Sequence, residues 1–289
     1  MEYRFLRFPG GKGKAVTLSY DDGCRHDIRM AAKLKEYGIP CTFNISSGLF
    51  GKDDQGWYLT VQEIQTHILD AGHEIAIHGK MHMAPGLSRP VDCIQDMLNC
   101  RLELEKTFGG IIRGMAYPDS GITNMQNQAD YANIRSYLQN LGIVYARTLG
   151  GDNNSFCLPS DWMAWMPTIR HRNPLIMEYI AQFLAQDPDR EKLYNAQRYP
   201  RLFYLWGHSF EFENDGNWEL LDEICQKLGG HEDIWYATNT EIYDYVQAYH
   251  ALIFSADGKT VYNPTLKTVW FRTDKKHYVI ESGETIHII

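Results

Sequence analysis

The sequence lacks the patterns that mark several large classes of protein. No run of about eighteen apolar residues is present, and the first ten residues contain no apolar stretch of signal-peptide length. Within the given sequence we therefore expect a cytoplasmic protein that does not enter a membrane. Basic residues number 28 against 36 acidic ones, giving a net charge of −8, so a nucleic-acid partner has no electrostatic support.

Cysteine pairs with metal-binding or redox spacing are also absent. The 6 cysteines are scattered without any C-x-x-C pair in a chain too large to need disulfides, so we interpret them as reduced thiols. No G-x-G-x-x-G follows a predicted strand, which removes the fingerprint of a dinucleotide-binding fold. The chain of 289 residues is 44% apolar and 13% aromatic, which is enough for a sizeable folded core.

Apolar β-type runs alternate with helical patterns along most of the chain. Strands are predicted at residues 15–20, 41–45, 73–77, 111–117, 143–147, 202–206 and 234–237, and helices at residues 27–37, 60–71, 90–108, 131–141, 174–186, 218–228 and 241–252. Strands that alternate with long helices favour parallel pairing, and a number of units near seven favours a barrel over an open sheet.

The pattern changes near residue 259, where alternation of period two predicts a β-meander. We therefore divide the chain into a barrel at residues 1–255 and a β extension at residues 256–289. The extension is too small for an independent domain, so we expect it to pack on the barrel or to form an interface.

Polar side chains follow three of the predicted strands. Asp21 and Asp22 end the first strand, His78 and His82 follow the third, and His208 follows the sixth. The carboxyl ends of parallel barrel strands lie on one face, where these side chains would meet. Alone, paired aspartates before a glycine are typical of a turn, and a lone histidine is commonly a core residue.

Together, these residues form a pattern typical of a catalytic metal site. If the turn after the third strand coils into a helix, the i, i+4 spacing puts His78 and His82 on one face. Two imidazoles and one carboxylate make three ligands and leave a coordination position open, as a catalytic ion needs. The second aspartate can then serve as a base.

Three segments resemble the motifs of the polysaccharide deacetylase family, also called the NodB homology domain or carbohydrate esterase family 4. They are Ser19-Tyr20-Asp21-Asp22-Gly23, His78-Gly79-Lys80-Met81-His82 and Leu205-Trp206-Gly207-His208. The resemblance implies an α/β fold, a distorted (β/α)7 barrel, that removes N-acetyl groups from amino sugars with one divalent ion. It implies that Asp21 is the catalytic base, that Asp22, His78 and His82 bind the metal, and that His208 is the general acid. We expect zinc, with cobalt, nickel, manganese or iron as alternatives.

The middle of the chain departs from the family pattern. Ala116, in Met115-Ala116-Tyr117-Pro118-Asp119-Ser120, stands where many members have an arginine that pairs with the catalytic aspartate. Another residue must then orient Asp21, and Arg113 and Arg170 are the candidates. A backbone N–H of the same turn is expected to stabilise the oxyanion, which places Tyr117, Pro118 and Asp119 beside the substrate.

The element that braces the catalytic histidine in the family is recognisable here only as Asp161-Trp162 or as residues 165–168. Trp162 and Trp206, with Trp165 and Trp218, are candidates to stack on a sugar ring, although aromatic residues are more often part of a core. His171 and Glu211 lie near motif residues in the sequence and are further candidates to line the pocket.

The resemblance leaves the substrate open between three functions. The first is removal of an N-acetyl group from an N-acetylated sugar or oligosaccharide. The second is hydrolysis of a small amide or cyclic ureide or imide, which the lack of a secretion signal favours over a cell-wall polymer. The third is a catalytically silent carbohydrate-binding relative, which the missing arginine suggests. We expect a small carbohydrate or amide as the partner, and a homo-oligomer is admissible.

Overall fold

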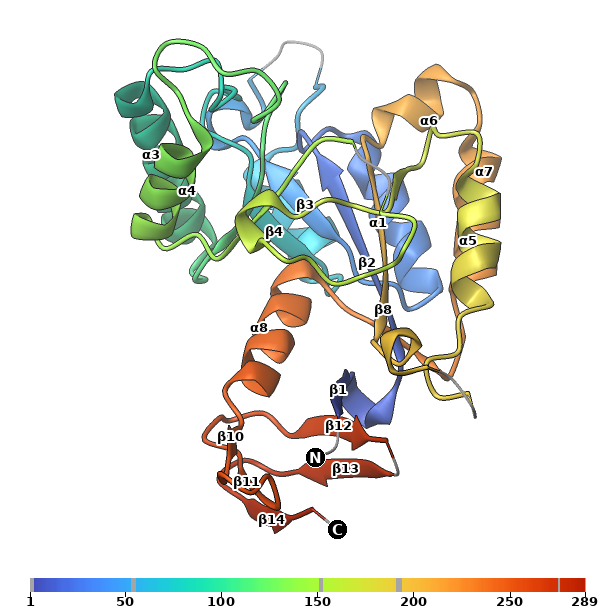
Figure 1. Ribbon diagram of the computed structural model, residues 1–289. Coiled ribbons are helices and arrows are strands. Elements are labelled where there is room, and N and C mark those ends of the chain that lie inside the picture. Colours follow the sequence, from blue (N-terminus) through green and yellow to red (C-terminus); the bar gives the residue numbers. More distant parts are fainter. Residues whose placement is uncertain (1–2, 53–55, 151–152, 191–193, 275, 289) are drawn as a thin grey trace.

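The computed structural model describes residues 3–52, 56–150, 153–190, 194–274 and 276–288 (Figure 1). Its centre is a curled parallel sheet in which the strands follow the order β6-β5-β4-β3-β2-β8-β7. Their bounds are β2 (Lys14–Asp21), β3 (Thr42–Ile45), β4 (Glu74–Ile77), β5 (Gly114–Ala116), β6 (Tyr145–Arg147), β7 (Ile169–Arg170) and β8 (Arg201–Gly207). This is the predicted distorted (β/α)7 barrel.

Helices cover the outside of this sheet, as crossovers between parallel strands require. Within the described residues, no helix is both long and apolar enough to cross a membrane. In Figure 1, α3 and α4 lie on one side of the sheet and α5 and α7 on the other. The helices are α1 (His26–Glu36), α2 (Val61–Glu63), α3 (Pro90–Phe108), α4 (Tyr131–Asn140), α5 (Ile176–Leu184), α6 (Phe210–Asn214), α7 (Trp218–Leu228) and α8 (Asn239–His250).

Local sequence signals explain where several helices begin and end. Pro90 fits the first turn of α3 because that position needs no N–H donor, and Gly109 ends the helix in the left-handed conformation. Thr60 and Glu63 form the predicted capping box. The helix that they open widens at once into a π-helix, η3 (Ile64–Leu69), which the periodicity did not predict.

Two strands differ from the prediction. β7 was not predicted, because two residues are too few to show a periodicity, yet it forms the edge of the sheet beside β8. The predicted last strand exists as β9 (Ile234–Tyr236), but it pairs with the beginning of β2. It therefore lies beside β2, outside the main strand order.

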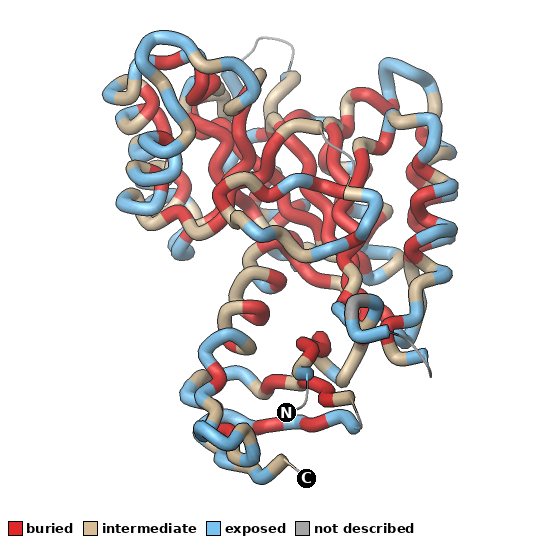
Figure 2. Tube along the Cα trace, in the orientation of Figure 1, coloured by how far each residue is buried: buried red, intermediate tan, exposed pale blue. Residues whose placement is uncertain are grey.

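The core lies on both faces of the parallel strands, and Figure 2 shows the buried residues concentrated there. All eight residues of β2 are buried, so the strand that ends at Asp21 runs through the middle of the molecule. The six cysteines are free, and five of them are buried, in agreement with the interpretation as reduced thiols.

The strands of the C-terminal region form two small antiparallel sheets. One has the order β10-β11-β14 and the other the order β1-β12-β13, so the first strand of the chain completes a sheet of its last residues. A single meander was predicted, and β1 was not. The bounds are β1 (Arg4–Arg7), β10 (Ile253–Phe254), β11 (Thr260–Tyr262), β12 (Val269–Thr273), β13 (His277–Ile280) and β14 (Thr285–His287).

Candidate active site

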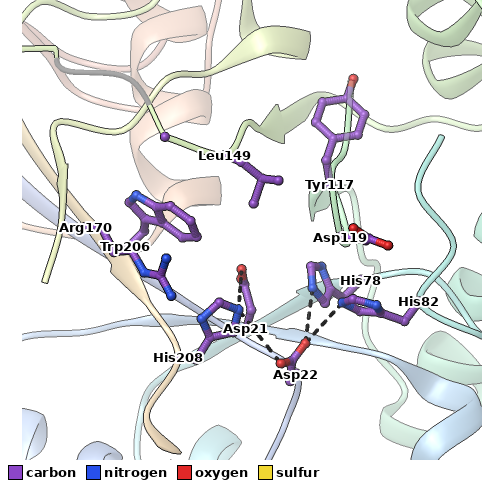
Figure 3. Close-up of a pocket in the computed structure, with 11 residues that line it drawn as sticks. Asp21, Asp22, His78, His82, Tyr117, Asp119, Leu149, Arg170, Trp206 and His208 are labelled. Carbon is purple, nitrogen blue, oxygen red and sulfur yellow. Dashed lines mark ion pairs between the residues drawn. The ribbon is translucent and has the colours of Figure 1, made fainter. Parts of the chain in front are cut away.

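Asp22, His78 and His82 converge at the carboxyl ends of the parallel strands (Figure 3). Asp22 follows the last residue of β2 and His78 follows the last residue of β4. The Asp22 Oδ1 atom lies 3.5 Å from the His78 Nε2 atom and 3.3 Å from the His82 Nε2 atom. Among the described residues, these three are the one group of histidine, cysteine or acidic side chains whose donor atoms all lie within 4.8 Å of one another.

The chemistry of these three donors fits a divalent ion. The His78 Nδ1 atom lies 3.0 Å from the carbonyl oxygen of Ala116, which can only accept, so Nδ1 carries the proton. This leaves the lone pair of Nε2 directed at Asp22, the arrangement that a histidine ligand needs. Burial raises the pKa of Asp22, but contacts with His78 and His82 outweigh it and hold the pKa far below its ordinary value, so Asp22 is ionised.

The loop that carries both histidines is a bend and not the helix that the i, i+4 spacing suggested. Gly79 has φ +72° and His82 has φ +56°, both in the left-handed region. The rings meet nevertheless, with centroids 4.8 Å apart. Asp96 of α3 holds the bend, because its Oδ1 atom accepts the N–H of Met81 at 2.8 Å.

Asp21 is held on both carboxylate oxygens by buried donors. The Asn44 side-chain amide donates to Oδ1 at 2.8 Å, and Arg147 donates to Oδ2. Asp21 is 1% exposed and the Arg147 side chain is fully buried. Arg147 is the last residue of β6, so it reaches the same rim as the motif residues.

Arg147 is the arginine that contacts Asp21, so the predictions that Arg113 or Arg170 orients Asp21 are wrong. Arg113 pairs with Asp244 of α8 at 2.8 Å, away from Asp21, and Arg170 pairs with Glu211. The sequence did contain a signal for Arg147, since it ends a predicted strand as the motif aspartates do. A charged residue at that position of a buried parallel strand requires a partner.

His208 lies between the two aspartates and a buried glutamate. Its Nε2 atom is 3.9 Å from the Asp21 Oδ2 atom and 3.8 Å from the Asp22 Oδ2 atom, while its Nδ1 atom is 3.5 Å from the Glu211 Oε1 atom. Burial lowers the pKa of His208, but the contact with Glu211 and the charges of both aspartates outweigh burial and raise it. His208 is therefore inclined to hold a proton.

Glu211 contacts His208, which the predicted bracing element does not. The carboxylate is 2% exposed and contacts Arg170, Arg172 and His171 in addition to His208. Burial raises its pKa, but the contacts with His208 and Arg170 outweigh burial and bring it to about 2. Glu211 stands three residues after His208 on the first turn of α6, a helix that the sequence analysis did not predict.

The segment around Trp162 lies outside the site. Asp161 accepts hydrogen bonds from the Met163 N–H and the Tyr131 hydroxyl, at 2.9 and 2.6 Å. The Trp162 ring packs on Trp165 and on Tyr243 of α8, with centroids 4.8 and 5.1 Å apart. Trp162 does not line the cavity beside the motif residues, and the hydrogen bonds of Asp161 are to Met163 and Tyr131 instead of His208. The segment packs on a second core cluster, and a substrate contact of Trp162 stays a prediction.

A cavity of about 460 Å³ opens above the five motif residues. Tyr117, Asp119 and Trp206 line it as predicted, whereas Pro118, Trp165 and Trp218 do not. Trp206 is 4% exposed, and the guanidinium groups of Arg147 and Arg170 lie 4.5 and 5.2 Å from the centre of its ring. Sequence analysis missed two lining residues, Leu149 and Gly150, which belong to the loop after β6.

The turn after β5 has few backbone N–H groups that are free to face the cavity. The backbone N–H of Tyr117 donates to the carbonyl of Arg147 at 3.0 Å, and its hydroxyl donates to the carbonyl of Met163 at 2.8 Å. Pro118 has no N–H. A donor from this turn would therefore have to be Asp119, which has φ +51°, or Ser120.

Comparison with known proteins gives a family match over part of the chain and a shared fold. Residues 9–143 match the model of a family described as polysaccharide deacetylase, and no curated protein matches the chain. A solved structure of an assigned polysaccharide deacetylase from Mycobacterium smegmatis shares 18% identity at a TM-score of 0.55, covering 86% of this chain and 96% of that one. Puue allantoinase shares 14% identity at a TM-score of 0.58, covering 84% of this chain and 93% of that one.

A third likeness is partial. The solved structure of the Streptococcus pyogenes deacetylase PplD shares 18% identity at a TM-score of 0.40, and the match covers 46% of this chain and 55% of that one. At such identities the solved structures show the fold alone. Asp21, Asp22, His78 and His82 lie within the residues that match the family model, and His208 lies beyond them.

Proposed function

We propose that the protein is a metal-dependent hydrolase that removes the N-acetyl group of an N-acetylated sugar or oligosaccharide. The match of residues 9–143 to the polysaccharide deacetylase family model supports this proposal. One observation supports it above the others: Asp21, Asp22, His78, His82 and His208 come from three distant parts of the chain and line one cavity. An accidental turn or a core histidine would not produce this convergence.

Asp22, His78 and His82 are the proposed metal ligands. They offer one carboxylate oxygen and two imidazole nitrogens, a donor set that suits zinc and also cobalt, nickel, manganese or iron. When bound, a divalent ion would act as a Lewis acid toward the acetyl carbonyl and the attacking water. Such a site needs an open position, and the cavity lies against these three side chains.

Asp21 is the proposed base that takes a proton from the attacking water. Asn44 and Arg147 hold its two oxygens, so the carboxylate has little freedom to rotate. A base that is already oriented avoids the cost of ordering it during the reaction. Its burial excludes competing water from all but the cavity side.

His208 is the proposed acid that protonates the departing amine. Amide hydrolysis expels a poor leaving group, which must gain a proton before the C–N bond breaks. The raised pKa of His208 favours the protonated ring near neutral pH. Its Nδ1 atom faces Glu211, so its Nε2 atom is the one that faces the reaction centre.

Acetate release from N-acetylglucosamine oligomers, measured with and without a chelator, tests the proposal. The untreated protein should release acetate, the chelated protein should not, and added zinc or cobalt should restore the activity. Asp21→Asn should bind metal stoichiometrically and lose turnover by at least about 1000-fold, since it removes the base. Asp257→Asn, in an exposed turn of the C-terminal region, is the matched control and should act as wild type.

Several results would contradict the proposal in distinct ways. Wild-type turnover by Asp21→Asn would show that Asp21 is not the base. Cleavage of allantoin without acetate release would identify the small cyclic ureide as the substrate. Stoichiometric metal binding with no turnover of either compound would favour the catalytically silent relative.

A further inference from the structure

Asn44 is a polar residue in the middle of a buried strand. It lies in β3, whose register places it directly beside Asp21 of β2. Asparagine is unfavourable in strands, and at full burial its amide must be hydrogen-bonded to avoid a large penalty. We propose that Asn44 is a positioning residue for Asp21, with its own amide held by the Ser19 hydroxyl.

The hydrogen bonds of Asn44 fix the orientation of its amide. Nδ2 lies 2.8 Å from the Asp21 Oδ1 atom and 2.7 Å from the Ser19 hydroxyl. An ionised carboxylate only accepts, so the amide must present its NH₂ group to Asp21. The carbonyl oxygen of the Asn44 side chain has no hydrogen-bond partner among the described residues.

This unpartnered oxygen shows that Asn44 is a poor choice for stability alone. Burying an acceptor without a partner costs about 1–3 kcal/mol, and an apolar residue would avoid that cost. The compensating interaction is the N–H donated to Asp21. Residues that violate a local rule of folding in this way are commonly found at functional sites.

A second group of buried polar side chains lies nearer the beginning of β2, beside β8. The Asn239 side-chain amide donates to the Tyr204 hydroxyl at 2.5 Å, and Thr17 donates to the Asn239 carbonyl oxygen at 2.8 Å. All of these residues are at most 1% exposed.

Asn44 ties Asp21 to Ser19 and so joins β2 to β3, while Asn239 joins Thr17 of β2 and Tyr204 of β8 to the beginning of α8. Ser19 and Thr17 belong to β2, Asn44 to β3, and Tyr204 to β8. Rotation of the Asn44 amide would break its bond to Ser19 as well as its bond to Asp21. Arg147 then holds the second oxygen of Asp21 from β6, so the carboxylate is fixed from both sides.

Asn44→Leu tests this role, with Thr17→Val as the matched control, because the buried Thr17 side chain lies on the same strand as Asp21 and bonds to Asn239 instead of Asn44. Both are buried, nearly isosteric changes, and Thr17→Val breaks only the bond to Asn239. Asn44→Leu should lower kcat on N-acetylglucosamine oligomers by about 100-fold, with KM and zinc affinity unchanged, because a misplaced reacting group costs about that much. Thr17→Val should lower the melting temperature and leave kcat within about twofold of wild type.

The assignment of Asp21 as a base rests on the proposed function. Crystal structures of both variants provide a readout that depends on neither the substrate nor that function. The Asp21 carboxylate should be rotated in Asn44→Leu and unmoved in Thr17→Val. If Asn44→Leu does not fold, Asn44→Ala should show the same rotation. An unmoved Asp21 in the Asn44 variants, or an equal loss of kcat in Thr17→Val, would overturn the positioning role. Absence of turnover by the wild type with a rotated Asp21 would contradict the proposed function and support the positioning role.

Discussion

Asp21 and Arg147 form an ion pair almost entirely shielded from water, with side chains 1% and 0% exposed. Removing two charges from water is costly, and their attraction offsets that cost only while both partners are present. Asp21 also receives the amide of Asn44, so both of its oxygens are satisfied. The hydrogen bonds from Asn44 and Arg147 therefore fix the Asp21 carboxylate, and loss of either member of the ion pair leaves an uncompensated buried charge.

Arg147→Met should destabilise the folded protein by about 3–5 kcal/mol, since it leaves Asp21 charged and unpaired in the core. Arg113→Met is the matched control: its partner Asp244 is 29% exposed, so we expect at most about 1 kcal/mol. Urea denaturation measures both. Adding Asp21→Leu to Arg147→Met should recover part of the loss, and a small effect of Arg147→Met would mean that water reaches the pair.

The side chains that sequence analysis could predict are those that follow an apolar run directly. Such a run predicts a buried strand, and parallel strands bring their ends together. That reasoning finds Asp21, Asp22, His78 and His208, and the i, i+4 spacing from His78 adds His82. Asn44 could not be predicted, because only the register of β2 and β3 shows that it lies beside Asp21. Glu211 was a candidate from its place in the sequence, but its contact with His208 could not be predicted, because that contact depends on the short helix α6.

At the scale of elements, the regular helices were easier to predict than the loops that carry function. The bounds of α3 agree with the predicted residues, because a proline begins the helix and a glycine ends it. The loop between His78 and His82 was expected to be helical and is a bend. Its shape depends on Gly79, where an added Cβ would lie 2.6 Å from the Asp96 Oδ2 atom, and on the bond from Met81 to that side chain.

Asp96→Ala should weaken zinc binding by about 10- to 100-fold, because the bend that presents His82 would lose the acceptor for the Met81 N–H. Asp92→Ala on the same helix is the control, since that carboxylate pairs with the exposed Arg89 at the surface. Competition with a chromophoric chelator measures zinc affinity for both variants. If Asp96→Ala and Asp92→Ala bound zinc equally well, the bend would keep its conformation without the contact from α3.

Short strands were beyond prediction for a related reason. β7 has two residues, too few to show a period, and β1, Arg4-Phe5-Leu6-Arg7, has no alternation of apolar and polar side chains. Both are strands only because a neighbour supplies hydrogen bonds, β8 for one and β12 for the other. Tertiary pairing therefore decided what local sequence left open.

At the scale of the whole molecule, the two ends of the chain depend on each other. β1 pairs with β12 over four residues, and Phe5 and Leu6 of β1 are 2% and 4% exposed. Arg7 and Arg272 both pair with Asp189, which follows α5 of the barrel. The division into a barrel at residues 1–255 and an extension at residues 256–289 stays a prediction. Removing the extension would remove the pairing of β1 with β12 and the contact of Arg272 with Asp189.

Deleting residues 256–289 should expose β1 and destabilise the remainder. Phe5 and Leu6 would each lose about 1.5–3 kcal/mol of burial, and Arg7 would share Asp189 with no second arginine. Limited trypsin digestion followed by mass spectrometry measures the exposure, because Arg4 and Arg7 are cleavage sites within β1 itself. Both should resist cleavage in the full chain and be cut in the shortened one, whereas the exposed Lys52 should be cut at similar rates in both. If Arg4 and Arg7 were equally protected after the deletion, the barrel would hold β1 without β12, and the division at residue 255 would separate two independent units.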